Sequence, residues 1–267
     1  PLLFRVVASA DRAVTHKDID WALLVGSKPR GPGMERYDLI RENGPIFVAE
    51  GRAIAQHAGS SVRVVAVGNP CNTNCLIARH AAGSGIPDER WTALTRLDQN
   101  RARALLAVKA GTRVHDVKRL VIWGNHSATL YPDFTNAVVG GRPATDVVDR
   151  AWLETELVAS VQQRGPAVIA ARGASSAFSA AQAVVDHVRS LITPTPADDW
   201  ASVAVVSDGS YGVPKGIVSS FPIRAAGDGW WEIAQGIAFD DHARSRIDAS
   251  IAELVREREL VTDLLSA

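Results

Sequence analysis

Val62-Arg-Val-Val-Ala-Val-Gly68 is the stretch that decides the fold class, because it is a short apolar run rich in β-branched residues that ends in glycine. Such a run is typical of a strand buried on both faces of a parallel sheet. A second run of this kind occupies residues 20–26, and a helix is expected between the two, from about Asp38 to His57. Another helical pattern starts near Thr73. Strands that alternate with helices of this length predict an α/β fold with a parallel sheet.

The same alternation extends outward in both directions. Residues 2–8 are expected to form a strand, residues 91–97 another, and residues 98–110 a helix. Beyond residue 119 the order changes to a pattern typical of an α+β domain: a strand at 119–124, helices at 149–163 and 174–192, strands within 201–234, and a helix at 241–259. We therefore place a domain boundary after Leu97, which gives one domain over residues 1–97 and a second over residues 98–267.

Composition excludes several classes of protein. Twenty-nine acidic residues balance twenty-nine basic ones among 267, so no overall charge favours nucleic acid or an anionic membrane surface. No stretch approaches the ~20 apolar residues that span a bilayer. The two cysteines, Cys71 and Cys75, have neither the number nor the neighbours of a zinc site or a disulfide framework, and they predict thiols in a reducing compartment. No metal site is expected.

His126 is the first candidate catalytic residue, since a β-rich run delivers it to a Gly124-Asn125 turn. Asp98 and Arg101 lie three residues apart, so both project from one face of the predicted helix at 98–110. A histidine suits the removal of a proton from a hydroxyl group, and a carboxylate on its other nitrogen fixes the tautomer. An arginine matches a substrate carboxylate bidentately. The three residue types predict hydride transfer from a 2-hydroxy acid to a nicotinamide, although each alone is also common as a turn cap, helix cap or surface pair.

The loop from Ser27 to Arg36 follows the strand at 20–26, at the edge where ligands bind in doubly wound sheets. It carries Arg30 and Arg36, together with two prolines and two glycines that suggest a hinged lid. A basic solvated loop is the alternative. Asn69 ends the next strand at the same edge, where its amide could contact a ligand or simply cap a turn.

Six segments, in order along nearly the whole chain, resemble the NAD-dependent malate dehydrogenases of the cytosolic and bacterial type, within the lactate/malate dehydrogenase superfamily. They are LLVGSKPRGPGMERYDL, VAVGNPCNTNCLIA, LTRLDQNRA, VIWGNHSATLYPD, ARGASSAFSAA and SDGSYGVPKG. The resemblance implies that His126 accepts the proton and that Asp98 is its partner. It implies that Arg101 holds the C1 carboxylate of malate or oxaloacetate, Arg30 the distal carboxylate, and Arg36 the C2 oxygen.

The resemblance also implies a set of cofactor contacts. Asn69 would touch both substrate and NAD, and the other contacts would come from Asn43, Glu50, Val67 and Gly68. Glu50 stands where the family usually has glutamine, which places a negative charge near a polyanion. Gln99 replaces the usual histidine of its motif. A cytoplasmic, homodimeric enzyme of the tricarboxylic acid cycle is implied as well.

The N-terminal part departs from the family. Relatives begin with a strand, a G-x-G-x-x-G turn and a second strand that ends in an acidic residue for the adenosine ribose, and no suitable match occurs here. On the order of 60 residues are expected to be missing, about two strand–helix units. We therefore expect a fragment that holds the remnant of a doubly wound (Rossmann) NAD-binding domain before its substrate domain. Without the ribose-reading residue, NAD and NADP are not distinguished.

Two other functions stay open. One is a non-catalytic remnant or assembly partner that cannot bind NAD, and an in-frame glycine-rich segment in the upstream DNA would exclude it. The other is a different 2-hydroxy-acid dehydrogenase such as a lactate dehydrogenase. Arg30 disfavours it, because lactate has no second carboxylate with which this arginine could pair.

Overall fold

The structure, a computed structural model, describes residues 2–29, 34 and 36–266. The chain divides into two compact units. The first comprises Pro1–Thr92 with Glu257–Ala267, and the second comprises Ala93–Arg256. The boundary after Leu97, drawn from the sequence as a limit between functional domains, stays a prediction.

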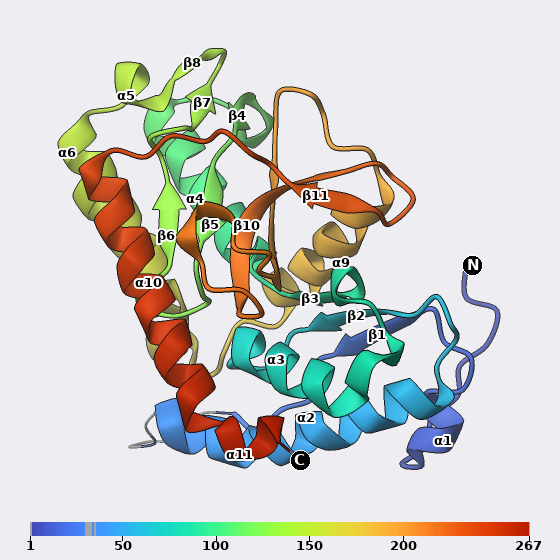
Figure 1. Cartoon of the computed structure of the whole chain (residues 1–267). Coiled ribbons are helices and arrows are strands. Elements are labelled where there is room, and N and C mark those ends of the chain that lie inside the picture. Colours follow the sequence, from blue (N-terminus) through green and yellow to red (C-terminus); the bar gives the residue numbers. More distant parts are fainter. Residues whose placement is uncertain (1, 30–33, 35, 267) are drawn as a thin grey trace. The chain divides into compact units, whose positions relative to one another are not determined.

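The first unit contains the predicted parallel strands. Strand β1 (Trp21–Leu24) pairs in parallel with β2 (Arg63–Ala66), with Trp21 opposite Arg63 (Figure 1). Strand β3 (Trp91–Ala93) follows β2 in the sheet order, and the Thr92 hydroxyl donates to the Val64 carbonyl at 2.9 Å. The parallel sheet predicted from the alternation of strands and helices is therefore confirmed for β1 and β2. Burial on both faces holds for β2, whereas Leu23 of β1 is 45% exposed because no described residue covers it.

The first unit also contains helices. They are α1 (Arg12–Thr15), α2 (Arg36–His57), α3 (Cys71–Ala82) and α11 (Thr262–Leu265), with short 3₁₀ turns at Gly83–Gly85 and Asp88–Arg90. Helix α3 packs on β2, and α2 lies alongside α3 (Figure 1). Gly51 of α2 permits this close approach, since a Cβ there would lie 2.1 Å from the Ala78 carbonyl oxygen.

The predicted strand at residues 2–8 is wrong. Residues 2–9 have no regular secondary structure, and Leu2 and Phe4 are fully exposed. An apolar run forms a strand only when a neighbouring strand satisfies its backbone groups, and no described strand pairs with this segment. The pattern of side chains was that of a strand, but the hydrogen-bonding partner is absent from the described residues.

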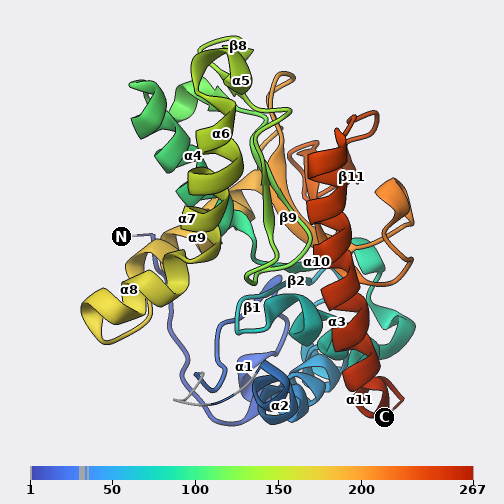
Figure 2. The ribbon, with the colours of Figure 1, turned by 90° about the vertical axis from the view of Figure 1, so that its left-hand side faces the viewer.

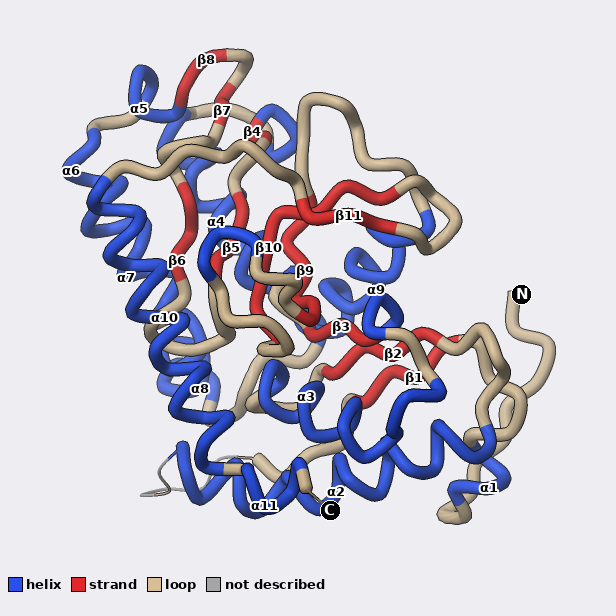
Figure 3. Tube along the Cα trace, viewed as in Figure 1, coloured by secondary structure: helices blue, strands red, loops and turns tan. Residues whose placement is uncertain are grey.

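The second unit is built on antiparallel strands. Strand β10 (Val218–Ala225) pairs with β9 (Ala201–Val206) on one side and β11 (Trp231–Ile233) on the other. Shorter strands form two further small sheets, joined by long loops (Figure 3). In one, β5 (Val121–Trp123) pairs with β6 (Tyr131–Asp133). In the other, β7 (Val138–Val139) pairs with β4 (Val117–Lys118) and with β8 (Arg142–Pro143). Trp123 is fully buried and meets Tyr211 edge-on, with ring centroids 4.9 Å apart.

The helices of the second unit largely follow the sequence pattern. They are α4 (Arg96–Ala110), α5 (Ala144–Val147), α6 (Arg150–Trp152), α7 (Val158–Gln162), α8 (Arg164–Arg172), α9 (Phe178–Ile192) and α10 (Asp241–Leu260), the last four residues of α10 being counted in the first unit. Helices α4 and α9 lie side by side (Figure 2). The helix predicted at 149–163 is interrupted by a π-helical turn at Leu153–Leu157, and α8 was not predicted. Within the described part of the chain, every helix is too short or too polar to traverse a bilayer.

Candidate active site

His126 and Asp98 meet in the second unit, as the sequence predicts. His126 Nδ1 is in hydrogen-bonding contact with Asp98 Oδ2. Asp98 lies in the first turn of α4 and is 1% exposed, whereas the side chain of His126 remains 22% exposed. A buried carboxylate therefore holds one imidazole nitrogen while the ring keeps some access to solvent.

Arg101 completes this cluster one helical turn further along α4. Its Nη1 lies 3.7 Å from Asp98 Oδ1, and its Nη2 donates to Ser176 Oγ at 3.3 Å. Burial lowers the pKa of Arg101 from its ordinary value, and the Asp98 carboxylate opposes this effect. The guanidinium stays charged all the same, because arginine does not lose its proton in proteins. The cluster thus offers a fixed cation beside an imidazole–carboxylate pair. Ser176 was not singled out from the sequence, although it belongs to the ARGASSAFSAA segment.

The turn that carries His126 comes directly after β5 in the chain. Gly124 has φ +86°, a conformation that side chains rarely adopt, and it exchanges backbone hydrogen bonds with Ser220 of β10. Asn125, which follows, is fully buried. The backbone is therefore tied to the sheet immediately before the imidazole.

In the first unit, Val67, Gly68 and Asn69 lie at the carboxyl end of β2. The amides of Val67 and Gly68 both donate to the Leu24 carbonyl, at 3.1 and 3.0 Å. Gly68 is buried, and a Cβ there would lie 2.7 Å from Ser27 Cβ. Val67 is partly exposed and Asn69 is exposed. Two of the three residues therefore remain accessible at the edge of the sheet where a ligand was predicted.

Asn43 acts within the protein as a clamp between two loops. Its Oδ1 accepts from the Lys28 amide at 2.8 Å, and its Nδ2 donates to the carbonyls of Lys28 and Asn69, at 3.2 and 3.0 Å. The side chain is fully buried. Asn43 therefore orders the backbone at Asn69, and its direct contact with a cofactor stays a prediction.

Glu50 is held by two basic side chains of the N-terminal segment. Its Oε1 accepts from Arg12 Nε at 2.7 Å, and its Oε2 lies 3.0 Å from His16 Nε2. These contacts attach α1 to α2. Because both carboxylate oxygens have protein partners, the charge that was expected to face a polyanion is partly neutralised, and the predicted cofactor contact stays untested.

The predicted loop carries two arginines. Arg30 lies outside the described residues. Arg36 begins α2 and forms an ion pair with Glu257, a carboxylate only 4% exposed that also accepts from the Thr73 hydroxyl. Glu257 was not singled out from the sequence, because a glutamate in a charged terminal helix gives no signal of burial. The predicted contact of Arg36 with a substrate oxygen stays a prediction.

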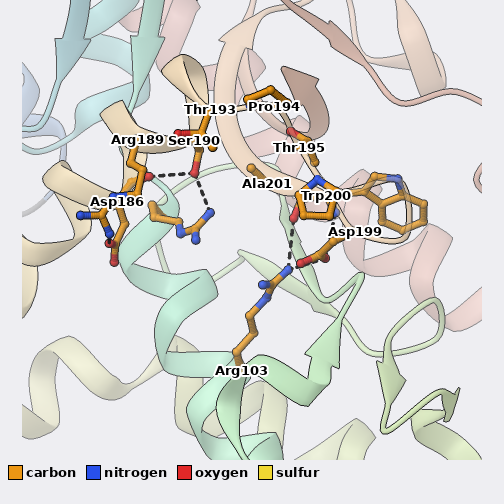
Figure 4. A pocket seen from close by; sticks show the side chains of 12 residues that line it. Arg103, Asp186, Arg189, Ser190, Thr193, Pro194, Thr195, Asp199, Trp200 and Ala201 are labelled. Carbon is orange, nitrogen blue, oxygen red and sulfur yellow. Dashed lines mark hydrogen bonds and ion pairs between the residues drawn. The ribbon is translucent and has the colours of Figure 1, made fainter. Parts of the chain in front are cut away.

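A charged cavity of about 280 Å³ lies elsewhere in the second unit (Figure 4). Arg103 Nη2 lies 2.7 Å from Asp199 Oδ1, and Arg96 donates to Ser190 Oγ at 2.9 Å. The residues that line the cavity are Arg96, Arg103, Asp186, Arg189, Ser190, Thr193, Pro194, Thr195, Pro196, Asp199, Trp200 and Ala201. None of His126, Asp98 and Arg101 is among them, so this cavity is separate from the predicted catalytic cluster.

Comparison with known proteins assigns both parts of the chain to one family. Residues 1–91 match the model of the lactate/malate dehydrogenase NAD binding domain, and residues 95–264 match that of the lactate/malate dehydrogenase alpha/beta C-terminal domain. The chain belongs to the lactate/malate dehydrogenase family. A malate dehydrogenase of Magnetococcus marinus is 53% identical over 266 residues, which cover 99% of this chain and 80% of that protein.

Solved structures of the lactate/malate dehydrogenase family show the same fold. Malate dehydrogenase from Naegleria fowleri has a TM-score of 0.90 at 40% identity, over 96% of this chain and 78% of that one. A lactate dehydrogenase from Trichomonas vaginalis, in complex with NADH and oxamate, has a TM-score of 0.92 at 32% identity, over 97% and 80% of the two chains. The resemblance read from the motifs is therefore confirmed at the level of the family.

Proposed function

We propose that this chain is a malate dehydrogenase, which transfers hydride reversibly between (S)-malate or oxaloacetate and NAD. The observation that carries the proposal is the contact of His126 with buried Asp98, with Arg101 one helical turn away. The 53% identity to a malate dehydrogenase over nearly the whole chain supports malate over other 2-hydroxy acids.

In this reaction His126 acts as the base. Asp98 accepts a hydrogen bond from Nδ1–H of His126 and so leaves Nε2 free to take the proton of the C2 hydroxyl. Malate then loses that proton to His126 and a hydride from C2, and the C2–O bond becomes the carbonyl of oxaloacetate. The buried Asp98 carboxylate stabilises the imidazolium that forms. In the reverse direction the imidazolium returns its proton to the C2 oxygen.

Three arginines would bind the substrate. Arg101 would hold the C1 carboxylate, which a planar guanidinium matches with two parallel hydrogen bonds. Arg30 would hold the distal carboxylate and Arg36 the C2 oxygen, as the family resemblance implies. The second carboxylate is what separates oxaloacetate from pyruvate, so Arg30 is the proposed determinant of specificity.

The accessible residues at the end of β2 suit a nicotinamide. Val67 is partly exposed there and Asn69 is exposed, while Gly68 lets the backbone pack closely on Ser27. When bound, NAD supplies the hydride acceptor. Asn69 would contact both the cofactor and the substrate, and Asn43 would support that position by holding the Asn69 carbonyl.

Replacement of His126 with Asn tests the proposal. We expect the rate of malate oxidation to fall by about 10²–10⁴, because a positioned base is lost. The affinity for NADH, followed by fluorescence titration, should change less than twofold. A variant that keeps the wild-type kcat would remove His126 from the mechanism and overturn the proposal.

We further propose that the enzyme is a cytoplasmic homodimer that works in the tricarboxylic acid cycle. The family resemblance supports the dimer, and two buried cysteines without a disulfide suit a reducing compartment. Sedimentation equilibrium of the purified protein measures the number of subunits, and a monomer at micromolar concentration would contradict the dimer.

A further inference from the structure

The turn that carries His126 is held from α10 by side chains that the reaction itself does not require. Ser250 Oγ accepts from the Asn125 amide at 3.0 Å and donates to Asn125 Oδ1, also at 3.0 Å. Ser250 and Asn125 are both fully buried. One hydroxyl therefore fixes both the backbone and the side chain of the residue immediately before the imidazole.

Glu253 holds the other side of the turn. Its Oε2 accepts from Ser127 Oγ at 3.0 Å and from the Thr129 hydroxyl. Ser250 and Glu253 are three residues apart and so lie on one face of α10. Ser127 and Thr129 are also bonded to each other, since the Thr129 amide donates to Ser127 Oγ at 3.2 Å. His126 is thus bracketed by two contacts from one helix.

The packing is close enough to leave the turn little freedom. A Cβ on Gly124 would lie 2.0 Å from Ser250 Oγ and 2.4 Å from Ser250 Cβ. Helix α10 is itself anchored by buried Ile247 and Leu254 on either side of these contacts. A displacement of the turn would therefore require either a shift of α10 or the loss of the Ser250 hydrogen bonds.

We infer that Ser250 and Glu253 are positioning residues of the reaction. They hold the turn so that the imidazole of His126 keeps its contact with Asp98 and its Nε2 stays where it can take the proton of the substrate hydroxyl. The inference rests on the proposed function, in which His126 is the base. Misplacement of a reacting group by about 1 Å can lower a rate about 100-fold. If the turn moves because the Ser250 hydroxyl is removed, kcat should fall while the binding of substrate stays nearly unchanged.

The decisive experiment combines Ser250→Ala with His126→Asn. In the wild-type background we expect Ser250→Ala to lower kcat for malate about 10- to 100-fold and to change KM less than threefold. In the His126→Asn background the same replacement should lower the residual rate less than twofold, because groups that act as one unit are strongly non-additive. An equal loss in both backgrounds would show a general structural role and overturn the inference.

Two further variants keep the test sharp. Ser250→Thr retains the hydroxyl and should recover most of the lost kcat. Glu253→Gln retains an oxygen that accepts from Ser127, whereas Glu253→Leu does not, so only the leucine variant should lower kcat strongly. Urea denaturation of each variant checks that it is folded, and Glu253, which is only partly buried, serves if Ser250→Ala does not fold.

The outcomes separate the inference from the proposal beneath it. If His126→Asn is fully active, the proposed function fails. If His126→Asn is inactive while Ser250→Ala and Glu253→Leu keep the wild-type kcat, the base is correct and the positioning role is wrong.

Discussion

Replacement of Gly124 with alanine should destabilise the protein more than any strain in its backbone angle alone explains. The residue has φ +86°, and a side chain in left-handed backbone costs roughly 1–2 kcal/mol. The new Cβ would also lie 2.0 Å from Ser250 Oγ, and such overpacking costs about 1–3 kcal/mol. We expect the free energy of unfolding to fall by about 2–5 kcal/mol in total.

A matched control separates the two contributions. Gly216 has φ +81°, and apart from its two chain neighbours no atom of the described residues lies within 4 Å of the position that its Cβ would take. Gly216→Ala should therefore report backbone strain without steric overlap, at about 1–2 kcal/mol. Urea denaturation with linear extrapolation measures both variants against the parent protein. Equal destabilisation of the two would show that Ser250 does not approach the turn as closely as described, and the reasoning would fail.

Four other replacements have defined outcomes. Asp98→Asn should lower kcat by about 10²-fold or more, because an amide can favour the wrong imidazole tautomer; NADH titration checks that cofactor binding persists. Glu50→Gln should change the NADH dissociation constant less than twofold if Glu50 serves mainly to hold α1, while its partly exposed pairs make the stability change only about 0.2–1 kcal/mol. Arg30→Gln should shift the ratio of kcat/KM from oxaloacetate toward pyruvate, and an unchanged ratio would assign specificity elsewhere. His187 is fully buried, and burial lowers its pKa to about 3. Below pH 6.5 the unfolded chain therefore binds a proton that the folded chain does not. The free energy of unfolding consequently falls as the pH is lowered, by about 2 kcal/mol between pH 6.5 and 5. His187→Leu should flatten that acid slope in urea titrations.

The parallel strands and the shared helix face of Asp98 and Arg101 could be predicted because local patterns decide both. The run at residues 62–68 is apolar on both faces, and β2 is buried accordingly. Asp98 and Arg101 share a helix face through their spacing alone, and His126 reaches Asp98 because the turn after β5 ends beside α4. The strands and the Asp98–Arg101 spacing are set within short stretches, whereas the pairing of His126 with Asp98, 28 residues away, was expected from the chemistry of the two residue types and from the family resemblance.

The remaining features depend on partners distant in the chain. Residues 2–8 have the side chains of a strand but no described neighbour to pair with. Helix α8 contains Gly165 and Pro166, which suggest a break, yet proline is tolerated in the first turn of a helix, where its missing amide is not needed. Ser250 and Glu253 give no signal at all, since their role arises only when α10 meets a turn about 125 residues away.

The buried thiols of α3 can report how often this helix detaches from the rest of the protein. Cys71 and Cys75 are at most 1% exposed, and burial raises the pKa of the Cys75 thiol, so the reactive thiolate is suppressed in the folded state. An alkylating or oxidising reagent can then reach them only in molecules where α3 has transiently detached. The rate of covalent modification therefore counts opening events. A substitution that loosens α3 would shorten the lifetime of the protein under oxidising conditions even where its activity at the outset is unchanged.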